Sequence, residues 1–342
     1  MMPTSILSRL DLNLVALILG AAILWFLPVG MKSYGIYVIS FWLVMSIAAM
    51  GLNLTLGYAG LKSLAQAAFL GIGAYATALM TAKGGIAGPV WSWPLAFLVS
   101  GLLTFLAGVA LGFPALRVKF HYLAFVTLAF ATVMFLIFRN EQWLTGGVYG
   151  FPNIPRPTLL GVKLNNDLAF FRFLLIMTLG LSLAMWWLLR SPWGRAFMAL
   201  RENPLRAASL GVNLRTYTLL AFAIGAGYGG LAGALYAPMV EFIDPAPFAI
   251  SASFVLLLTV VVGGQGYFLG PFLGAAFSYV LPEMLRVTGG YYLLVYAALV
   301  LALLLVSPQG LLGLVEKFRE HRRVKAAQAM RDASKVMLEA GR

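Results

Sequence analysis

Long apolar runs separated by short polar segments dominate the pattern along the chain. Most of the runs hold about 18 residues or more, enough for a helix to cross a hydrocarbon core roughly 30 Å thick. The runs are continuous and do not alternate between apolar and polar positions, which favours helices over strands. The pattern therefore predicts an all-α polytopic membrane protein with about ten transmembrane helices. The expected spans are residues 12–31, 36–56, 64–80, 93–111, 120–138, 170–189, 216–237, 250–265, 268–285 and 291–307.

The number and direction of the crossings follow from the segments between the runs. Only "GGQGYFLGP" separates the eighth expected span from the ninth, so eight to ten crossings are compatible with the sequence. The first apolar run, Leu12 to Gly30, is too long for the core of a signal peptide, and we expect it to remain as a span. With an even number of crossings most lysines and arginines fall on one side, and the positive-inside rule then places both termini in the cytoplasm.

Two long loops and a tail complete the organisation. We expect one transmembrane domain over residues 1–315, with an outer loop at 139–169 and an inner loop at 190–215. The basic tail at 316–342 has helical propensity and mixed charge, which predicts a cytoplasmic helix in solvent or on the membrane surface. A partner-binding helix is the alternative for this tail.

Composition agrees with a membrane protein. Charged residues make up 10% of the 342 positions and hydrophobic residues 61%, and the mean hydropathy is +0.91. An ordinary soluble domain has about 25% charged residues. The net charge of +13 would suggest nucleic-acid binding in a soluble protein. Here the basic residues lie in loops and the tail, so we expect contact with membrane lipid and no nucleic acid.

The sequence lacks the residues that metal binding, catalysis and ATP hydrolysis require. The chain has no cysteine, and its two histidines, His121 and His321, lie far apart, so we expect no metal site. It has no G-x-x-x-x-G-K-[ST] motif for an ATPase of its own and no carboxylate deep within a span. We therefore expect no catalytic residue, no cofactor and no proton-coupled transport, whereas sodium coupling through neutral oxygens stays open.

The inner loop contains a short helix with defined ends, within "ALRENPLRAASLGV". Asn203 is a good N-cap, Pro204 suits the first helical position, and Gly211 suits the position after the helix. Before it, residues 194–201 can form two helical turns, with Arg201 available to solvent. A plain connector with inside-facing charge would explain the arginines, but it would not explain the caps. A docking helix for a partner explains both.

Small residues recur every fourth position in the seventh span and again further on. They line one helix face and let another helix approach closely, either within this chain or in a second subunit. The residues are Ala221, Gly225, Gly229, Gly233 and Ala237, and then Gly266, Gly270 and Gly274.

A third glycine-rich stretch, from Gly51 to Ala76, breaks between the second and third spans. Neutral polar residues lie beside the break, namely Asn53, Ser63 and Gln66. Polar side chains at membrane depth are tolerated where they line a cavity or pack against protein. The sequence leaves two interpretations open: these residues line a solute path, or they form hydrogen bonds between helices.

These segments together resemble one family. "GLNLTLGYAG…AAFLGIGAYA", "YLAFVTLAF…LTGGVYGFPNIPRP", "GRAFMALRENPLRAASLGVNLRTYTLLAFAIGAGYGGLAGALYAP", "VVGGQGYFLGPFLGAAFSYVLPEMLR" and "SPQGLLGL" are similar to the permease subunits of branched-chain amino acid ABC importers. The resemblance is to the partner of the permease pair that has the longer inner loop, and it covers about residues 46 to 314.

The resemblance implies a multi-pass permease of the bacterial inner membrane that imports branched-chain or similar apolar amino acids. It implies four kinds of partner or ligand: a second homologous permease, two cytoplasmic ABC ATPases, ATP and Mg²⁺ on those ATPases, and a periplasmic solute-binding protein. The loop would dock on the ATPase through Arg201, Glu202, Arg206 and Ala207, with Asn203, Pro204 and Gly211 setting the helix ends.

One segment departs from the family pattern. Members commonly have Gln-Val-Ser-Leu-Gly-His where this chain has residues 61–66, "LKSLAQ". The same family includes importers of urea, short amides and aromatic acids, so the departure bears on the solute more than on the architecture. Two other classes are the alternatives: an ATP-independent secondary porter or channel, and an intramembrane enzyme, whose catalytic cluster the sequence lacks.

Overall fold

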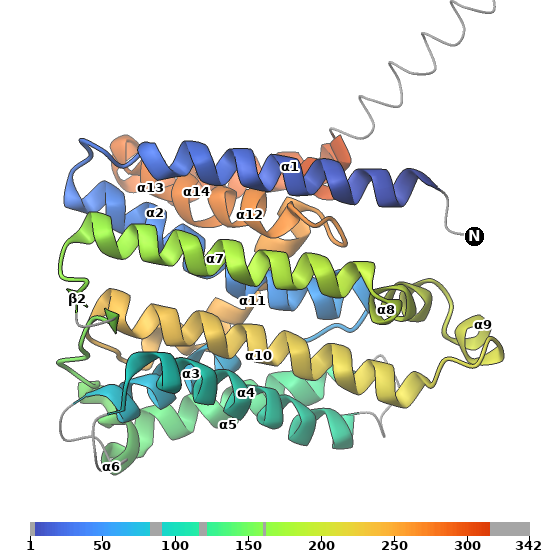
Figure 1. The fold of residues 1–342 in the computed structure, drawn as a ribbon, viewed down its shortest axis with the longest axis horizontal. Helices are drawn as coiled ribbons and strands as arrows, with labels where there is room; N and C mark the ends of the chain where they lie inside the picture. Colours follow the sequence, from blue (N-terminus) through green and yellow to red (C-terminus); the bar gives the residue numbers. More distant parts are fainter. Residues whose placement is uncertain (1–3, 83–90, 116–121, 160–161, 315–342) are drawn as a thin grey trace, which may run out of the picture.

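The computed structural model describes residues 4–82, 91–115, 122–159 and 162–314. Its long helices run roughly side by side and form a bundle (Figure 1). One end of the bundle carries α9 (Pro204–Ser209), and we call it the α9 end. The opposite end carries the hairpin of β1 (Thr158–Leu159) and β2 (Val162–Lys163), and we call it the hairpin end.

The first half of the chain supplies five long helices and a short cap at the hairpin end. A π-helical turn, η1, continues α2 without a break. The elements are α1 (Thr4–Phe26), α2 (Ser33–Leu52), η1 (Asn53–Tyr58), α3 (Gln66–Thr81), α4 (Trp93–Ala115), α5 (Leu123–Asn140), α6 (Gln142–Thr145) and η3 (Gly147–Tyr149).

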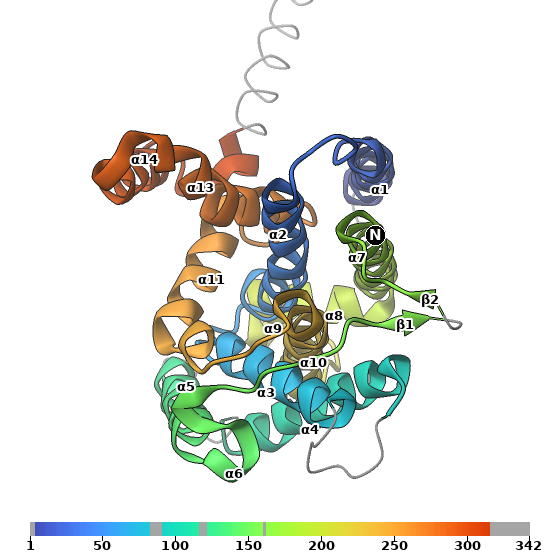
Figure 2. The same cartoon turned by 90° about the vertical axis from the view of Figure 1, so that its left-hand side faces the viewer.

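The second half contains the central helix and a series of shorter ones. The elements are α7 (Asp167–Arg190), α8 (Pro192–Glu202), α9, α10 (Leu214–Val240), η4 (Ala246–Phe248), α11 (Ile250–Gly263), α12 (Gly270–Ala275), η5 (Ala276–Val280), α13 (Leu281–Leu285), η6 (Arg286–Tyr291) and α14 (Tyr292–Val306). In the end view, α10 lies in the middle, and α2, α3 and α4 pack against it (Figure 2).

Local chemistry fixes the ends of α10. The side chain of Asn213 accepts a hydrogen bond from the N–H of Thr216 at 3.3 Å, which caps the first turn. At the other end Glu241 adopts a left-handed conformation with a φ of +59° and stops the helix. Between these ends most of the helix is buried, and the Tyr228 hydroxyl donates to the carbonyl oxygen of Leu181 on α7 at 2.9 Å. This helix is therefore the core of the bundle.

The outer helices expose apolar side chains, as expected of a protein in lipid. Ile23 on α1, Leu98 on α4 and Leu301 on α14 are each more than half exposed. No described side chain of α14 is buried within the chain. Hydrocarbon accommodates such surfaces, because the side chains are apolar and the backbone polar groups in the interior of a helix are paired within it.

The all-α prediction is confirmed, apart from the one short hairpin. Every expected span overlaps a described helix, and the span at 268–285 consists of α12, η5 and α13 joined end to end. Among the described residues, six helices are long and apolar enough to cross a membrane. The number and direction of crossings stay predictions. The tail at 316–342 and His121 lie outside the described residues.

Candidate functional site

The segment between α7 and α10 begins with a well-defined helix, α8. The Ser191 side chain accepts a hydrogen bond from the N–H of Trp193 at 3.2 Å, and Pro192 occupies the first helical position. Phe197 and Leu200 point from α8 into the bundle and are almost fully buried. This buried pair holds α8 against the bundle at the α9 end.

The second helix of the segment, α9, has both of the predicted ends. Oδ1 of Asn203 accepts from the N–H of Arg206 at 3.1 Å, and Pro204 fills the first position. At the other end Gly211 is left-handed, with a φ of +86°. The N–H of Val212 donates to the carbonyl oxygen of Ala207 at 3.1 Å. This is the Schellman arrangement that ends many helices, and it gives α9 a fixed length.

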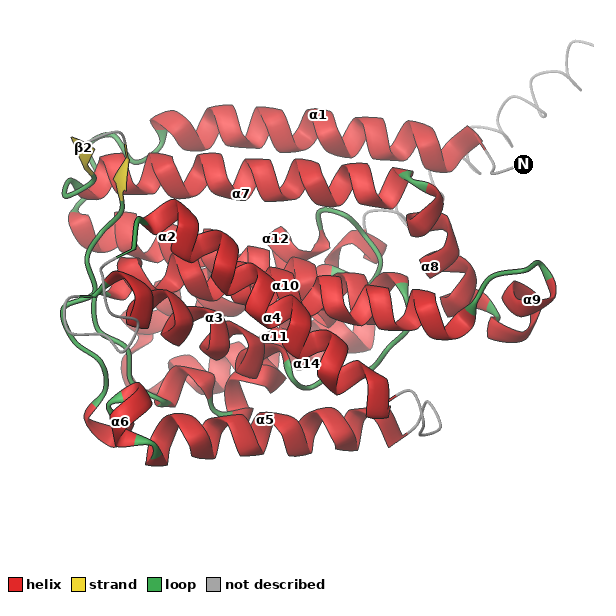
Figure 3. Cartoon of the chain, turned by 60° about the horizontal axis from the view of Figure 1, so that its bottom comes forward, coloured by secondary structure: helices red, strands yellow, loops and turns green. Residues whose placement is uncertain are grey.

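The exposed surface of α9 is apolar at two positions. Leu205 and Leu210 are 82% and 83% exposed, among the most exposed large side chains that the structure describes. Figures 1 and 3 show α9 projecting beyond the rest of the bundle. Leu205 on α9 and Leu210 at its C-terminal cap are thus held in the open at one end of the bundle, where a partner or lipid would stabilise them.

The residues expected to contact a partner divide into two groups. Glu202 and Arg206 are exposed beside the two leucines. Ala207 instead is 2% exposed, and its backbone bonds within the loop. Its small side chain therefore lets α9 fold back on the loop. Leu205 and Leu210 were missed by the sequence analysis, although leucines on a capped helix outside any apolar run were the signal that could have revealed them.

Arg201 has a role that the sequence analysis did not predict. We expected it to be available to solvent, and it is exposed, but its Nη1 also donates a hydrogen bond to the carbonyl oxygen of Gly57 in η1. Gly60, with a φ of +73°, follows at the point where the chain leaves η1, and its α-carbon lies next to Arg201. The end of α8 is thereby hydrogen-bonded to η1, near the break between η1 and α3.

Asn53 makes a second long-range contact of η1, with the turn between α11 and α12. Its Nδ2 donates to the carbonyl oxygen of Tyr267 at 2.9 Å, and its Oδ1 accepts from the N–H of Gly266 at 2.9 Å. Asn53 is 2% exposed, so both of its polar ends are used inside the protein. The amide clamps the turn between α11 and α12 onto η1.

Gln66 and Ser63 are also engaged within the chain. Nε2 of Gln66 donates to the carbonyl oxygens of Ala48 on α2 and Gly225 on α10, at 2.9 and 3.2 Å. The Ser63 hydroxyl accepts from the N–H of Ala65 at 3.3 Å. Both side chains are buried. The geometry thus favours the interpretation of hydrogen bonds between segments for Asn53 and Gln66, whereas the hydrogen bond of Ser63 is local.

The predicted small-residue face of α10 packs inside the chain. A Cβ on Gly225 would lie 2.7 Å from the carbonyl oxygen of Gly51, and one on Gly229 would lie 3.0 Å from Phe69. A Cβ on Gly233 would collide with the carbonyl oxygen of Leu70 on α3. These glycines let α2 and α3 approach the backbone of α10, which is the intrachain alternative considered above.

The second glycine series needs a correction. Gly266 does not lie on a helix face. It sits in the turn between α11 and α12 with a φ of +79°, a conformation that only glycine adopts without strain. Gly270 begins α12, where an added Cβ would meet the carbonyl oxygen of Gly264. The four-residue spacing was misread at Gly266 because a turn and a helix face both favour glycine.

No group of three or more histidine, aspartate or glutamate side chains in the described part of the chain could hold a metal ion. What the fold and the segment define is a multi-pass helical membrane protein with a short capped helix exposed at one end and the π-helical turn η1 hydrogen-bonded to α8 beside it. This is the architecture of a transport permease.

The comparisons with known proteins identify the family. Residues 34–307 match the sequence profile of the family described as "Branched-chain amino acid transport system / permease component", and the chain belongs to it. The chain is similar to the high-affinity branched-chain amino acid transport system permease protein LivM of Escherichia coli, with 34% identity over 79% of this chain and 68% of the relative.

Two more distant relatives show the breadth of the similarity. The probable branched-chain amino acid transport permease protein LivM of Methanocaldococcus jannaschii is 26% identical over 70% of this chain and 77% of that protein. The autoinducer 2 import system permease protein LsrC of Salmonella typhi is 29% identical over 55% of this chain and 54% of that protein. No solved structure matches the chain.

Proposed function

We propose that the chain is the membrane-spanning permease subunit of an ABC importer that carries branched-chain amino acids across the inner membrane. Family membership over residues 34–307 supports the transport class, and the names of the relatives that cover most of the chain support the solute. The chain contributes the path, and separate ATPase subunits that bind ATP and Mg²⁺ contribute the energy. The alternatives, an importer of urea, short amides or aromatic acids and an ATP-independent porter, are not favoured by these relatives.

The proposed partners are a second homologous permease, two cytoplasmic ABC ATPases and a periplasmic solute-binding protein. The α9 end would face the cytoplasm and the hairpin end the periplasm. The fold agrees with this orientation, because the described N-terminal end, the last described residues and α9 all lie toward the same end of the bundle (Figure 1). The arginines between residues 190 and 215 lie in that region as well, as the positive-inside rule requires.

Energy would enter through α9. When two ATPases close on ATP, their grip on the permease changes, and the difference in affinity for its two states moves the equilibrium between them. The exposed Leu205 and Leu210 would insert into a groove on the ATPase, with Glu202 and Arg206 around them. Arg201 would pass the movement on to η1 through its hydrogen bond to Gly57. Asn203, Pro204, Ala207 and Gly211 would hold α9 in shape.

The polar residues beside the break would support the wall of the solute path. Asn53, Ser63 and Gln66 already bond to the protein, so they would position the broken segment and leave solute contact to their neighbours. A neutral wall suits an amino acid with an aliphatic side chain.

The observation that carries the coupling proposal is the exposed leucine pair on a capped helix. A double substitution, Leu205→Asp with Leu210→Asp, tests it by co-purification of the ATPase subunits with the affinity-tagged chain from its native membrane. Each buried leucine contributes about 1.5–3 kcal/mol, so the pair corresponds to an affinity loss of at least about 100-fold. We expect the ATPases to be lost from the complex, and with them the ATP hydrolysis that the complex supports.

Val148→Asp is the matched control, because Val148 is 65% exposed at the hairpin end, far from α9. This variant should retain the full stoichiometry of ATPase subunits. If the double variant also retains it, and hydrolyses ATP as fast as the parent complex, α9 is not the docking element.

A further inference from the structure

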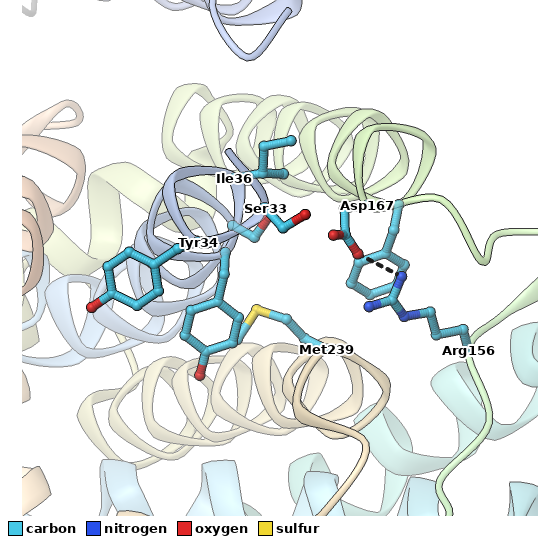
Figure 4. A pocket seen from close by; sticks show the side chains of 9 residues that line it. Ser33, Tyr34, Ile36, Arg156, Asp167 and Met239 are labelled. Atoms are coloured by element: carbon cyan, nitrogen blue, oxygen red, sulfur yellow. Dashed lines mark hydrogen bonds and ion pairs between the residues drawn. The ribbon is translucent and has the colours of Figure 1, made fainter. Parts of the chain in front are cut away.

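A cavity of about 330 Å³ opens at the hairpin end, where α2, α7 and α10 meet. Figure 4 shows its side chains, with the Arg156–Asp167 ion pair on one side and the side chains of α2 on the other. The lining combines an apolar part, Ile36, Phe170 and Met239, with hydroxyl and charged groups. The volume lies at the lower end of the range for small-molecule sites, about 300–1,000 Å³, which suits a single small solute.

The charged side of the cavity is held in a fixed geometry. Arg156 donates from Nη1 to Oδ1 of Asp167 at 2.9 Å and to the carbonyl oxygen of Asn165 at 2.9 Å. It donates from Nε to Oε1 of Glu241 at 2.6 Å. Only 20% of its side chain is exposed. One guanidinium thus joins the loop before α7, the first residue of α7 and the end of α10.

The backbone is built to hold this arrangement. Glu241 has a φ of +59°, a left-handed conformation that is uncommon outside glycine. Its carbonyl oxygen accepts from the N–H of Ile154 at 3.1 Å, and Phe151 pairs with Ile243 through two backbone hydrogen bonds. The loop that carries Arg156 is therefore fastened to the end of α10. Glu241 itself lines a neighbouring cavity, which shares Arg156 and Asp167 with this one, so it supports the ion pair from the far side.

The apolar side is equally well defined. Phe170, Met239 and Ile36 are 3%, 6% and 7% exposed and form a buried surface next to the ion pair. The guanidinium carbon of Arg156 lies 5.3 Å from the centre of the Phe170 ring. The charged group and the apolar wall are thus adjacent, within the span of one amino-acid molecule.

The charges of the site select for a ligand that carries both signs. Two carboxylates, Asp167 and Glu241, flank one guanidinium, so the site has no net positive charge to attract a simple anion. A simple cation could pair with Asp167, but it would gain nothing from the guanidinium or from the apolar wall. A zwitterion matches both groups, because its carboxylate can accept from Arg156 and its ammonium can donate to Asp167.

We infer that this cavity is a binding site for a free α-amino acid with an apolar side chain, at the entrance of the path through the permease. The α-carboxylate lies against Arg156, the α-ammonium against Asp167, and the side chain against Phe170, Met239 and Ile36. This inference rests on the proposed function, and it adds to it a site on the permease itself.

The absence of cysteine from the chain makes a direct test possible. Ser33→Cys places a single thiol of this chain on the exposed rim of the cavity. In the complete complex in native-membrane vesicles of periplasmic-side-out orientation, labelling by a membrane-impermeant maleimide is followed on this subunit's gel band. We expect L-leucine to slow the labelling. Val148→Cys, at the same end but outside the cavity, should label at the same rate with and without L-leucine.

Two substitutions then test the assigned contacts in the Ser33→Cys background. Asp167→Asn and Arg156→Lys should each raise the L-leucine concentration for half-protection by about tenfold or more, because each weakens a charged hydrogen bond. Glu141→Gln, which removes an exposed carboxylate at the same end, should change the L-leucine concentration for half-protection by no more than about twofold. Isocaproate and isoamylamine, which lack the ammonium or the carboxylate, should protect poorly in every variant.

The outcomes separate the site from the proposed function. If Ser33→Cys labelling is unaffected by L-leucine in vesicles that take up L-leucine, the site is wrong and the proposed function stands. If L-leucine protects but no uptake of L-leucine occurs, the site stands and the proposed function is wrong. If L-leucine neither slows the labelling nor is taken up, both the site and the proposed function are wrong. If Asp167→Asn or Arg156→Lys misfolds, Met239→Trp, which fills the cavity from its apolar side, should abolish protection; intact protection then refutes the site.

Discussion

Replacing Asn53 by alanine separates the two interpretations of the polar residues beside the broken helix. The side chain makes two hydrogen bonds of 2.9 Å, to the carbonyl of Tyr267 and from the N–H of Gly266. Hydrogen bonds of this kind contribute about 0.5–1.5 kcal/mol each in soluble proteins and about 0.6 kcal/mol on average in a membrane helix bundle. Asn53→Ala should therefore lower the free energy of unfolding by about 1–3 kcal/mol.

Asn53→Asp should cost more, although the two side chains have nearly the same shape. One carboxylate oxygen would replace the amide group that donates to the carbonyl oxygen of Tyr267. Two hydrogen-bond acceptors would then face each other at a site that is 2% exposed. Removing the donor leaves a buried carbonyl unpaired and adds a buried charge, so we expect a loss of about 3 kcal/mol or more.

Unfolding in mixed micelles with increasing sodium dodecyl sulfate measures both effects, and uptake of L-leucine gives the KM in parallel. If Asn53 is structural, the unfolding midpoint falls and the KM of the folded fraction stays unchanged. An unchanged midpoint together with a KM raised several-fold would refute this reasoning and place the amide against the solute. Asn140→Ala, at an exposed asparagine that ends α5, controls for the loss of an asparagine side chain.

Four further predictions follow from single positions. Gly233→Ala should destabilise the protein by about 1–3 kcal/mol in the same micelle assay, because the added Cβ collides with α3. Gly180→Ala should instead stabilise α7 by about 0.5–1 kcal/mol, since a Cβ there meets nothing within 4 Å. Gly211→Ala should cost α9 about 1 kcal/mol through its left-handed φ, so amide hydrogen exchange in α9 should speed up about fivefold. Arg201→Met should leave the ATPases bound but lower the ATP hydrolysis that substrate stimulates; loss of binding would show that Arg201 contacts the ATPase instead.

Features encoded by neighbouring residues could be predicted from the sequence. The ends of α9 are one case, because Asn203, Pro204 and Gly211 act on backbone groups within three or four positions of themselves. The apolar runs are another, because the thickness of the membrane sets their length. The small-residue face of α10 was also predictable, since four-residue spacing places side chains on one side of a helix whatever it packs against.

Features that depend on distant partners could not be predicted. Arg156 and Glu241 are 85 positions apart, and only the packing of the hairpin-end loop against α10 brings them together. Arg201 was expected to face solvent, because nothing near it in the sequence reveals the carbonyl oxygen of Gly57. Gly266 was placed on a helix face because spacing alone does not distinguish a helix from a turn with a positive φ.

The contacts around the break explain how a small displacement at α9 can reach the bundle interior. Asn203 is both the end of α8 and the cap of α9, so the two helices share a residue and cannot move independently. Arg201, two residues earlier, bonds to η1, and Asn53 in η1 bonds to the turn that starts α12. A π-helical turn is a weak point in a long helix and often lies at a functional site. We propose that a force on α9 acts first on η1, the π-helical continuation of α2, and carries the α11–α12 turn along with it.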